Sequence, residues 1–290
     1  MTAIAVVIFC NAVLSIVAHR KGSGNTGSEE SPNICGKETT QSEQSALGGR
    51  VTLAGSTSME KMLNAMAECF MLRYPEVSVT AEFTGSSAGI EALLAGSAAI
   101  GCSSRALTER ERNLGAVEHI AAMDVIAVIT DYANPVTALT KEQLCDIYTG
   151  KIKNWREVGG PDEAVVVVGR EAGSGTRQAF EETLGIAGEC AYANELDSTG
   201  AVVARAVTIP GVIGYVSLDV TGDKVRVISI DGIEPSAESV SAGDYLLVRP
   251  FVLVTKGMVD EQSREVQAFF AFLHSEEGRK VMRQVGLFPL

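Results

Sequence analysis

The residues of this chain best suited to chemistry form the segment GREAGSGTR at positions 169–177. It follows the apolar, β-branched run at 164–168 and precedes a helix-like segment. A turn that joins a strand to a helix directs free backbone N–H groups and the positive end of the helix dipole at one point. Arg170 adds a permanently charged guanidinium, and Ser174 and Thr176 add hydroxyl donors. The segment therefore predicts capture of a small oxyanion.

A nucleotide-binding phosphate loop is the main alternative for this segment. That motif requires a glycine, four further residues and then Gly-Lys followed by Ser or Thr. Five positions after Gly169 the chain has Ser174, and no lysine lies between Gly169 and Phe180. The sequence therefore excludes this motif. An ordinary strand–turn–helix connection with a capping hydroxyl remains open for the segment taken alone.

Three upstream turns repeat the same chemistry. They are AGSTS at 54–58, TGSSAG at 84–89 and CSSR at 102–105, each placed after a strand-like stretch. In an open α/β sheet, ligands bind outside the carboxyl ends of the strands. Four hydroxyl-rich turns, two of them with an adjoining arginine, therefore predict one shared site.

With these turns, three further segments make the chain resemble the phosphate-binding proteins of Pst-type ABC importers, which have the type II periplasmic-binding-protein fold. The further segments are LTKEQLCDIYTGKIKNW at 139–155, PGVIGYV at 210–216 and RPF at 249–251. The resemblance covers residues 50–290. It implies an α/β fold of two lobes, each a mostly parallel sheet flanked by helices. We expect two hinge crossings, near 125–132 and 222–246.

The resemblance also implies which residues contact phosphate. They are Thr57 and Ser58 in the first turn, Ser86 in the second, and Arg170, Ser174, Gly175 and Thr176 in the fourth. Some members of the family have a carboxylate at the position of Ser104, so here another residue must accept the phosphate proton. Our candidate is Asp124, just before the apolar run 125–129. Ser104 and Arg105 complete the predicted site, although Arg105 could instead pair with Asp124 or tie down a surface turn.

A buried carboxylate in an anion site would select phosphate. At neutral pH phosphate keeps at least one proton, which a carboxylate can accept, whereas sulfate has none. Opposing two lone pairs or two like charges in a buried site costs on the order of several kcal/mol. The same fold binding molybdate, tungstate or sulfate remains an alternative.

An enzyme that hydrolyses phosphate esters is a further alternative. We find no paired carboxylates at hydrolytic spacing, and His119 and His274 lie far from the four turns in sequence. No Cys-x-x-Cys pair or histidine spacing predicts a metal site. We therefore predict no enzyme activity, no catalytic residues, no metal and no cofactor.

The sequence predicts four regions. Residues 1–20 are a signal or membrane anchor, 21–49 a disordered tether, 50–130 with 226–290 the first lobe, and 131–225 the second lobe. The apolar run at 2–18 is followed by His-Arg-Lys, and the tether is rich in Gly, Ser, Thr, Glu and Gln. We expect an extracytoplasmic protein tethered to the cell membrane by this segment or by a lipid on Cys10 or Cys35. A wrongly assigned start is a further alternative.

Composition restricts the partners. The net charge is −12, from 36 acidic and 24 basic residues, which argues against nucleic acid because backbone phosphates require a basic surface. The resemblance implies inorganic phosphate and the permease subunits of an ABC transporter as partners, and we expect a monomer. Four cysteines lie in apolar segments and are expected to be buried small side chains, not disulfides. They are Cys69, Cys102, Cys145 and Cys190.

Overall fold

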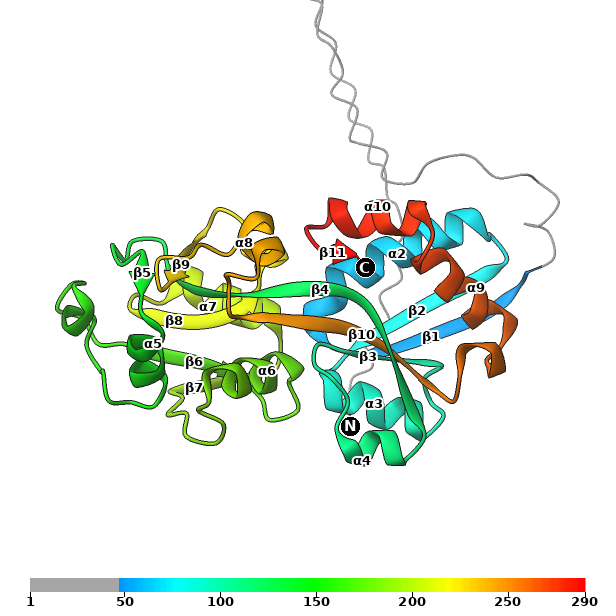
Figure 1. Ribbon diagram of the computed structural model, residues 1–290, viewed down its shortest axis with the longest axis horizontal. Helices are drawn as coiled ribbons and strands as arrows, with labels where there is room; N and C mark the ends of the chain where they lie inside the picture. Colours follow the sequence, from blue (N-terminus) through cyan, green and yellow to red (C-terminus); the bar gives the residue numbers. More distant parts are fainter. Residues whose placement is uncertain (1–46, 290) are drawn as a thin grey trace, which may run out of the picture. The chain divides into compact units, whose positions relative to one another are not determined.

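The long strand β4 (Ala116–Asp131) organises the fold, because its two halves belong to two different lobes (Figure 1). The computed structural model describes residues 47–289; the predictions of an anchor and of lipidation at Cys10 or Cys35 concern residues outside this range. Up to Val125, β4 pairs with β10 (Val248–Lys256), and from Ile126 onward it pairs with β8 and β9. We define lobe 1 as 47–125 with 248–289, and lobe 2 as 126–247.

Lobe 1 is a sheet in the order β2-β1-β3-β10-β4, covered by helices. Its other strands are β1 (Gly49–Gly55), β2 (Val77–Phe83), β3 (Ile100–Ser103) and β11 (Phe288–Pro289). Its helices are η1 (Thr57–Met59), α2 (Glu60–Arg73), α3 (Ser86–Leu94), α4 (Glu109–Asn113), η4 (Val259–Glu261), α9 (Arg264–Leu273) and α10 (Glu276–Gln284). Strand β1 pairs in parallel with β2 and β3, whereas β10 is antiparallel to β3 and β4.

The core of lobe 1 forms because α2 presents apolar residues at helical spacing. Met62, Met66 and Phe70 are fully buried on one face of α2. The ring of Phe70 meets that of Phe269 on α9 edge to face, with centroids 5.2 Å apart. These contacts hold α2 against the rest of lobe 1 and so position η1, which directly precedes it.

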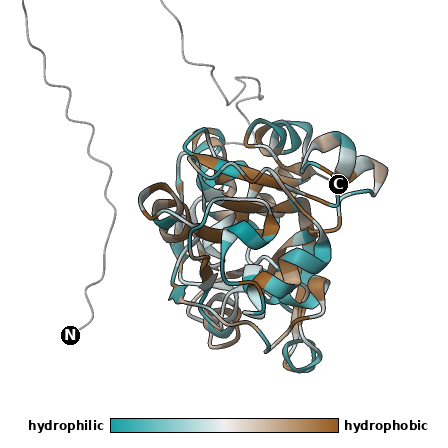
Figure 2. Ribbon diagram, turned by 90° about the vertical axis from the view of Figure 1, so that its left-hand side faces the viewer, coloured by the Kyte–Doolittle hydropathy of each residue, from teal (hydrophilic) through white to brown (hydrophobic). Residues whose placement is uncertain are grey.

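Lobe 2 surrounds the second half of β4. Its strands are β5 (Ala138–Leu139), β6 (Val166–Arg170), β7 (Asn194–Leu196), β8 (Val212–Ser217) and β9 (Val225–Ile230). Its helices are α5 (Lys141–Tyr148), η2 (Trp155–Val158), α6 (Gly175–Leu184), α7 (Thr199–Thr208), η3 (Leu218–Val220) and α8 (Ala237–Ala242). Figure 2 shows apolar strands lying behind more hydrophilic helices.

Two local features stabilise lobe 2. Helix α5 begins with a capping box in which Thr140 accepts from the N–H of Gln143 and Gln143 accepts from that of Thr140. Trp155 is fully buried in the lobe 2 core, and its Nε1–H donates to the carbonyl of Gly211 at 2.9 Å. The second crossing lies just past the end of the predicted range 222–246, and the predicted lobe boundary at 226 is wrong.

Strand β9, expected to return to lobe 1, remains in lobe 2. It pairs with β4 and with β5, and Ile228 and Ile230 lie in the lobe 2 core. The chain therefore returns to lobe 1 at β10, near Val248, and not at 226. An apolar six-residue strand can pair with the sheet of either lobe, so the sequence of β9 does not show to which lobe it belongs. The structured region also starts before the predicted end of the tether, since Leu47 is buried and β1 begins at Gly49.

The cysteine prediction is wrong at one position. Cys69, buried on α2, is disulfide-bonded. Cys102, Cys145 and Cys190 are free; Cys102 is fully buried, as predicted, whereas Cys145 and Cys190 are only partly buried. Within residues 47–289, no helix is long and apolar enough to cross a bilayer.

Candidate functional site

The four predicted turns meet at the junction of the two lobes. Three belong to lobe 1 and follow β1, β2 and β3, whose parallel arrangement brings their carboxyl ends to the same edge. The fourth follows β6 in lobe 2 and opens α6. All the predicted site residues are buried: Thr57, Ser58, Ser86, Ser104, Arg105, Asp124, Arg170, Ser174, Gly175 and Thr176.

Four serines of lobe 1 form what we call the hydroxyl cluster: Ser56, Ser58, Ser86 and Ser104. The hydroxyl of Ser56 donates to that of Ser104 at 2.9 Å and lies 2.9 Å from that of Ser58. The Oγ atoms of Ser86 and Ser104 are 3.3 Å apart, and the N–H of Ser104 donates to Ser86 Oγ. Side chains from three separate turns are therefore within hydrogen-bonding distance of one another.

The first turn of α6 packs directly against this cluster. Gly175 permits the contact, because a Cβ at this position would collide with the Oγ atoms of Ser86 and Ser104. Ser174 caps the helix by accepting from the N–H of Arg177, and the N–H groups of Gly175 and Thr176 have no acceptor within the helix. The positive end of α6 therefore faces the serines of lobe 1.

Two further contacts join the lobes beside the cluster. The hydroxyl of Thr176 donates to Ser58 Oγ at 3.5 Å, and those of Thr57 and Thr199 lie 3.1 Å apart. Thr199 begins α7 in lobe 2, and its own N–H donates to Thr57 Oγ1. Both lobes thus contribute hydroxyl groups to one site.

Arg170 is held in place by several acceptors. Its Nε and Nη2 donate to the two carboxylate oxygens of Glu171 at 3.0 and 2.9 Å, and Nη1 donates to Thr199 Oγ1 at 3.2 Å. Carbonyls of Leu196 and Asp197 accept from the same Nε and Nη2. A guanidinium has five N–H groups, and these bonds occupy four of them. The remaining N–H, on Nη1, is free to donate to a ligand. Arg170 therefore directs Nη1 toward the threonines of the site.

A second buried arginine, Arg249 on β10, was not predicted as a site residue. Its Nε donates to Asp124 Oδ2 at 2.8 Å, and Nη1 donates to Thr176 Oγ1 at 2.6 Å. Asp124 also accepts from the hydroxyl of Ser217 at the end of β8. Burial raises the pKa of Asp124, while the neighbouring Arg249 and Ser217 lower it. Arg249 thus connects Asp124 to the first turn of α6.

The hydrogen bonds from Arg249 to the serines have a defined direction. Each hydroxyl has a single proton. Because Ser56 donates to Ser104, Ser58 must donate to Ser56, and Ser58 in turn accepts from Thr176. A chain of donors therefore starts at the charged guanidinium of Arg249 and ends in the hydroxyl cluster. Such charge-assisted chains strengthen each member.

Arg105 lies at the edge of the cluster and is engaged elsewhere. Its Nη1 and Nη2 donate to the two carboxylate oxygens of Glu111 at 2.9 and 2.7 Å, and Nη2 also contacts Ser87 Oγ at 3.3 Å. Of the roles considered for Arg105, pairing with Asp124 is wrong, because Asp124 pairs with Arg249. Arg105 ties its turn to the start of α4, and direct contact with a ligand stays a prediction.

The chemistry of the site is that of anion binding. Hydroxyl groups, two guanidinium groups and helix N-termini are all hydrogen-bond donors that suit a tetrahedral oxyanion. Within residues 47–289, no group of three or more His, Cys, Asp or Glu could hold a metal ion. His119 donates to or accepts from Thr255 Oγ1 at 2.8 Å, and His119 and His274 line a groove beside α9 that contains none of the site residues.

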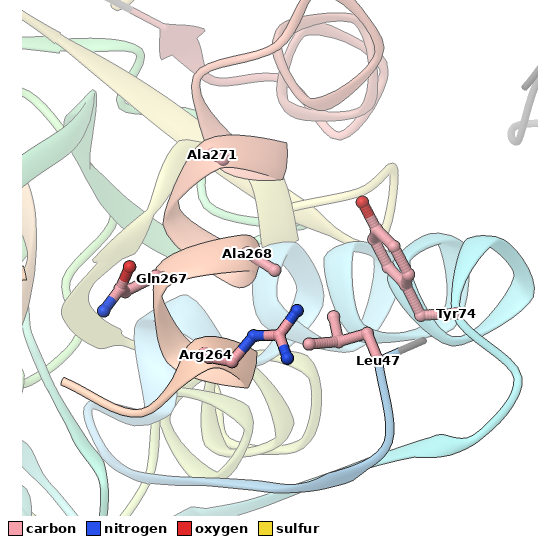
Figure 3. Close-up of a pocket in the computed structure, with 6 residues that line it drawn as sticks. All are labelled: Leu47, Tyr74, Arg264, Gln267, Ala268 and Ala271. Atoms are coloured by element: carbon pink, nitrogen blue, oxygen red, sulfur yellow. The ribbon is translucent and has the colours of Figure 1, made fainter. Parts of the chain in front are cut away.

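Two other hollows differ in their relation to the site. A groove of about 640 Å³ runs along α2 and α7 and is lined by Thr57 and Thr199, so it borders the site at the lobe junction. A pocket of about 400 Å³ lies on lobe 1, where Arg264 extends beside Leu47 and opposite Tyr74 (Figure 3). None of the site hydroxyls lines this second pocket, which is therefore separate from the candidate site.

Sequence reasoning missed four residues that the structure places in the site. They are Ser56, Thr199, Ser217 and Arg249. Ser56 stands in the first predicted turn, so that signal was present. Arg249 is also in a segment that carries the family resemblance, but nothing in its local sequence distinguishes it from an ordinary strand residue. Thr199 and Ser217 had no distinguishing pattern.

Comparisons with known proteins give one consistent result. The family model described as "PBP superfamily domain" matches residues 38–277. The phosphate-binding protein PstS of Bacillus subtilis is 32% identical over 92% of this chain and 88% of its own length. A crystal structure from Clostridium perfringens, described as a phosphate ABC transporter substrate-binding protein with bound phosphate, has a TM-score of 0.80 and 38% identity over 83% of this chain and 100% of that one. An ABC-type phosphate transport receptor from Vibrio cholerae has a TM-score of 0.69 and 33% identity over the same shares.

Proposed function

The chain belongs to the PBP superfamily and, within it, to the phosphate-binding proteins, and we propose that it captures inorganic phosphate outside the cytoplasm and delivers it to an ABC importer. The observation that carries this proposal is the convergence of donors from both lobes at one buried site. The family consists of transport proteins, so we assign no catalytic residue. The permease subunits of the importer are the proposed partners, and the protein acts as a monomer tethered to the membrane.

The proposed ion lies between the hydroxyl cluster and the first turn of α6. Ser86 and Ser104 would donate from lobe 1, with Thr57 beside them, and Ser58 would exchange its bond to Ser56 for one to the ion. The N–H groups of Gly175 and Thr176 would donate from lobe 2. Arg170 would add the charge of its remaining Nη1–H. These donors belong to different lobes, so the ion would stabilise the closed arrangement through its contacts with both.

Asp124 is the proposed source of selectivity for a protonated oxyanion. Its carboxylate is 1% exposed and already holds Arg249 and Ser217. Each carboxylate oxygen can accept more than one hydrogen bond, so Asp124 keeps capacity for the phosphate proton. Facing sulfate, the same carboxylate has no proton to accept and repels the ion.

Calorimetric titration of the full chain with phosphate, arsenate, sulfate and molybdate tests the proposal. We expect phosphate to bind, arsenate to bind more weakly because it shares the shape and protonation of phosphate, and sulfate to fail to compete. Equal displacement by sulfate or molybdate would assign the site to another oxyanion. Turnover of a chromogenic phosphate ester that disappears with Arg170→Ala would assign an enzyme instead.

The variant Asp124→Asn separates two roles of this carboxylate. If Asp124 accepts the phosphate proton, the variant loses the preference for phosphate over sulfate. If Asp124 only holds Arg249, the variant changes the affinity for both ions alike, which would refute the selectivity role. Asp162→Asn, which alters an exposed carboxylate by the same chemistry, is the matched control.

A further inference from the structure

Asp219 is a buried carboxylate close to the site that none of the proposed phosphate contacts uses. It lies in η3, two residues after Ser217. Both of its side-chain oxygens are buried and lack a hydrogen-bond donor of normal geometry among residues 47–289, because the nearby hydroxyl of Ser217, which is close enough to lower the pKa of Asp219, donates to Asp124. Lys61 on α2 does not pair with this carboxylate; its Nζ donates to the carbonyls of Asp219 and Val285 at 2.6 and 3.3 Å. An unpaired buried carboxylate is costly, so its presence calls for an explanation.

The position of Asp219 is at the junction of the lobes. Element η3 directly follows β8 of lobe 2, and Ser217 at the end of β8 lies opposite Ile126 of β4. On the lobe 1 side, a Cβ placed on Gly286 would be 3.5 Å from the Cβ of Asp219. The carboxylate is therefore packed where movement of one lobe against the other would change its surroundings.

Ser217 connects this carboxylate to the phosphate site. Its single hydroxyl proton is donated to Asp124, which holds Arg249, and Arg249 donates to Thr176. An ionised Asp219 beside Ser217 is a second acceptor for that one proton. The charge on Asp219 thus acts on the same network that orients Arg249.

Three charged groups face Asp219 from the surrounding elements: Asp124 on β4, Lys61 on α2 and Arg249 on β10. Burial first, and then the charge of Asp124, raise the pKa of Asp219 to about 6, although Ser217, Lys61 and Arg249 oppose the rise. The carboxylate therefore changes charge in mildly acidic solution.

We propose that Asp219 is a positioning residue for the phosphate site, acting through Ser217 and Asp124. When Asp219 is uncharged, the hydroxyl of Ser217 donates its hydrogen bond to Asp124, and the guanidinium of Arg249 is available to the anion. When Asp219 is ionised, it competes with Asp124 for the hydrogen bond from Ser217 and adds a second negative charge near Arg249. Both effects weaken phosphate binding. By reciprocity, bound phosphate favours the protonated form of Asp219. This inference rests on the proposed function.

The test compares the phosphate affinities of the parent chain, Asp219→Asn and the control Asp223→Asn between about pH 5 and pH 8. The ionisation of phosphate itself is common to all three proteins and cancels in a ratio of dissociation constants. We expect parent and Asp219→Asn to bind equally well near pH 5. Near pH 8 the variant should bind more tightly by about 5-fold or more, the scale of a modest coupling between sites. Asp223 is exposed, so its variant should follow the parent at every pH.

A ratio that does not change with pH would overturn the inference, because a merely structural role for Asp219 gives a constant factor. Failure of the parent chain to bind phosphate would instead overturn the proposed function. Ser217→Ala provides an independent variant should Asp219→Asn not fold. It breaks the link while keeping the carboxylate, so its affinity relative to that of the parent must also change with pH, and a constant ratio counts against the proposal.

Discussion

The two parts of the site hold their donors in opposite ways. The hydroxyl cluster of lobe 1 is uncharged, and its serines satisfy one another through hydrogen bonds of 2.9 to 3.3 Å. The arginines are charged, and each is neutralised by a carboxylate: Arg170 by Glu171, and Arg249 by Asp124. The hydroxyl cluster therefore supplies oriented dipoles, and the arginines supply charges that are paired with carboxylates.

This difference shows how a protein of net charge −12 can hold an anion. Distant surface charges are screened within about 8–10 Å at physiological salt, whereas buried donors act at contact distance. Pairing each arginine with a carboxylate limits the positive charge of the site without removing its N–H groups. The two arginine pairs also differ from each other. Glu171 is 32% exposed, whereas both members of the Arg249–Asp124 pair are almost completely buried.

The largest effect is expected from breaking the buried pair. Arg249→Ala leaves Asp124 without its counter-charge in an interior site, which should lower the free energy of unfolding by about 3–5 kcal/mol. Urea denaturation measures this change. The control Arg112→Ala removes a surface partner of Glu118 and should cost less than about 1 kcal/mol.

The double variant Asp124→Leu with Arg249→Met sharpens this comparison. Replacing a whole buried ion pair by apolar side chains is often neutral for stability or favourable. The double variant should therefore regain most of the lost stability, and still bind phosphate poorly because the donor to Thr176 is absent. Recovery of full binding would mean that the pair serves folding alone.

A smaller effect is expected at Arg170, where the loss appears in binding. Arg170→Ala should weaken phosphate binding by about 1.5–3 kcal/mol, the contribution of a charge-assisted hydrogen bond, or roughly 10- to 150-fold. Stability should change less than in Arg249→Ala, because Glu171 reaches solvent once it is unpaired. Calorimetric titration measures the change, with the exposed Arg156→Ala as control. Unchanged phosphate binding by Arg170→Ala would show that the site is misplaced.

The positions of the four turns could be predicted from sequence because each has a local cause. Glycine, serine or threonine ends a strand at each of them, and three of the four turns also begin a helix. Parallel strands bring the ends of β1, β2 and β3 to one edge. Gly55 illustrates this, since its φ of 149° is unfavourable for other residues and a Cβ there would collide with the backbone of Cys102. The local sequence is therefore sufficient to predict where these strands end.

The partners of the arginines could not be predicted, because they depend on register over long separations. Asp124 and Arg249 are 125 residues apart and meet only because β4 and β10 pair antiparallel with these two residues opposite each other. One residue of slip would turn each side chain to the other face of the sheet. The crossing near Val248 was misplaced for a related reason: the apolar pattern of β9 does not indicate which lobe it pairs with.

The smallest effects are expected in the hydroxyl cluster, where single alanines test whether the donor chain from Arg249 matters. Ser58→Ala interrupts this chain between Thr176 and Ser56, whereas Ser86→Ala removes a member near its end. Each should weaken phosphate binding by about 0.5–1.5 kcal/mol, the net contribution of a neutral hydrogen bond.

Ser58→Ala separates the remaining serines from the charged guanidinium of Arg249, whereas Ser86→Ala leaves the chain intact as far as Ser104. Because members of a hydrogen-bond chain polarise one another, Ser58→Ala should have the larger effect of the two. Titration of each variant and of the double variant measures the coupling between them, and a non-additive result is expected for members of one network. Equal, additive losses would mean that the serines act as independent donors. In that case lobe 1 would supply a set of separate dipoles, and the charge of Arg249 would not extend beyond Thr176.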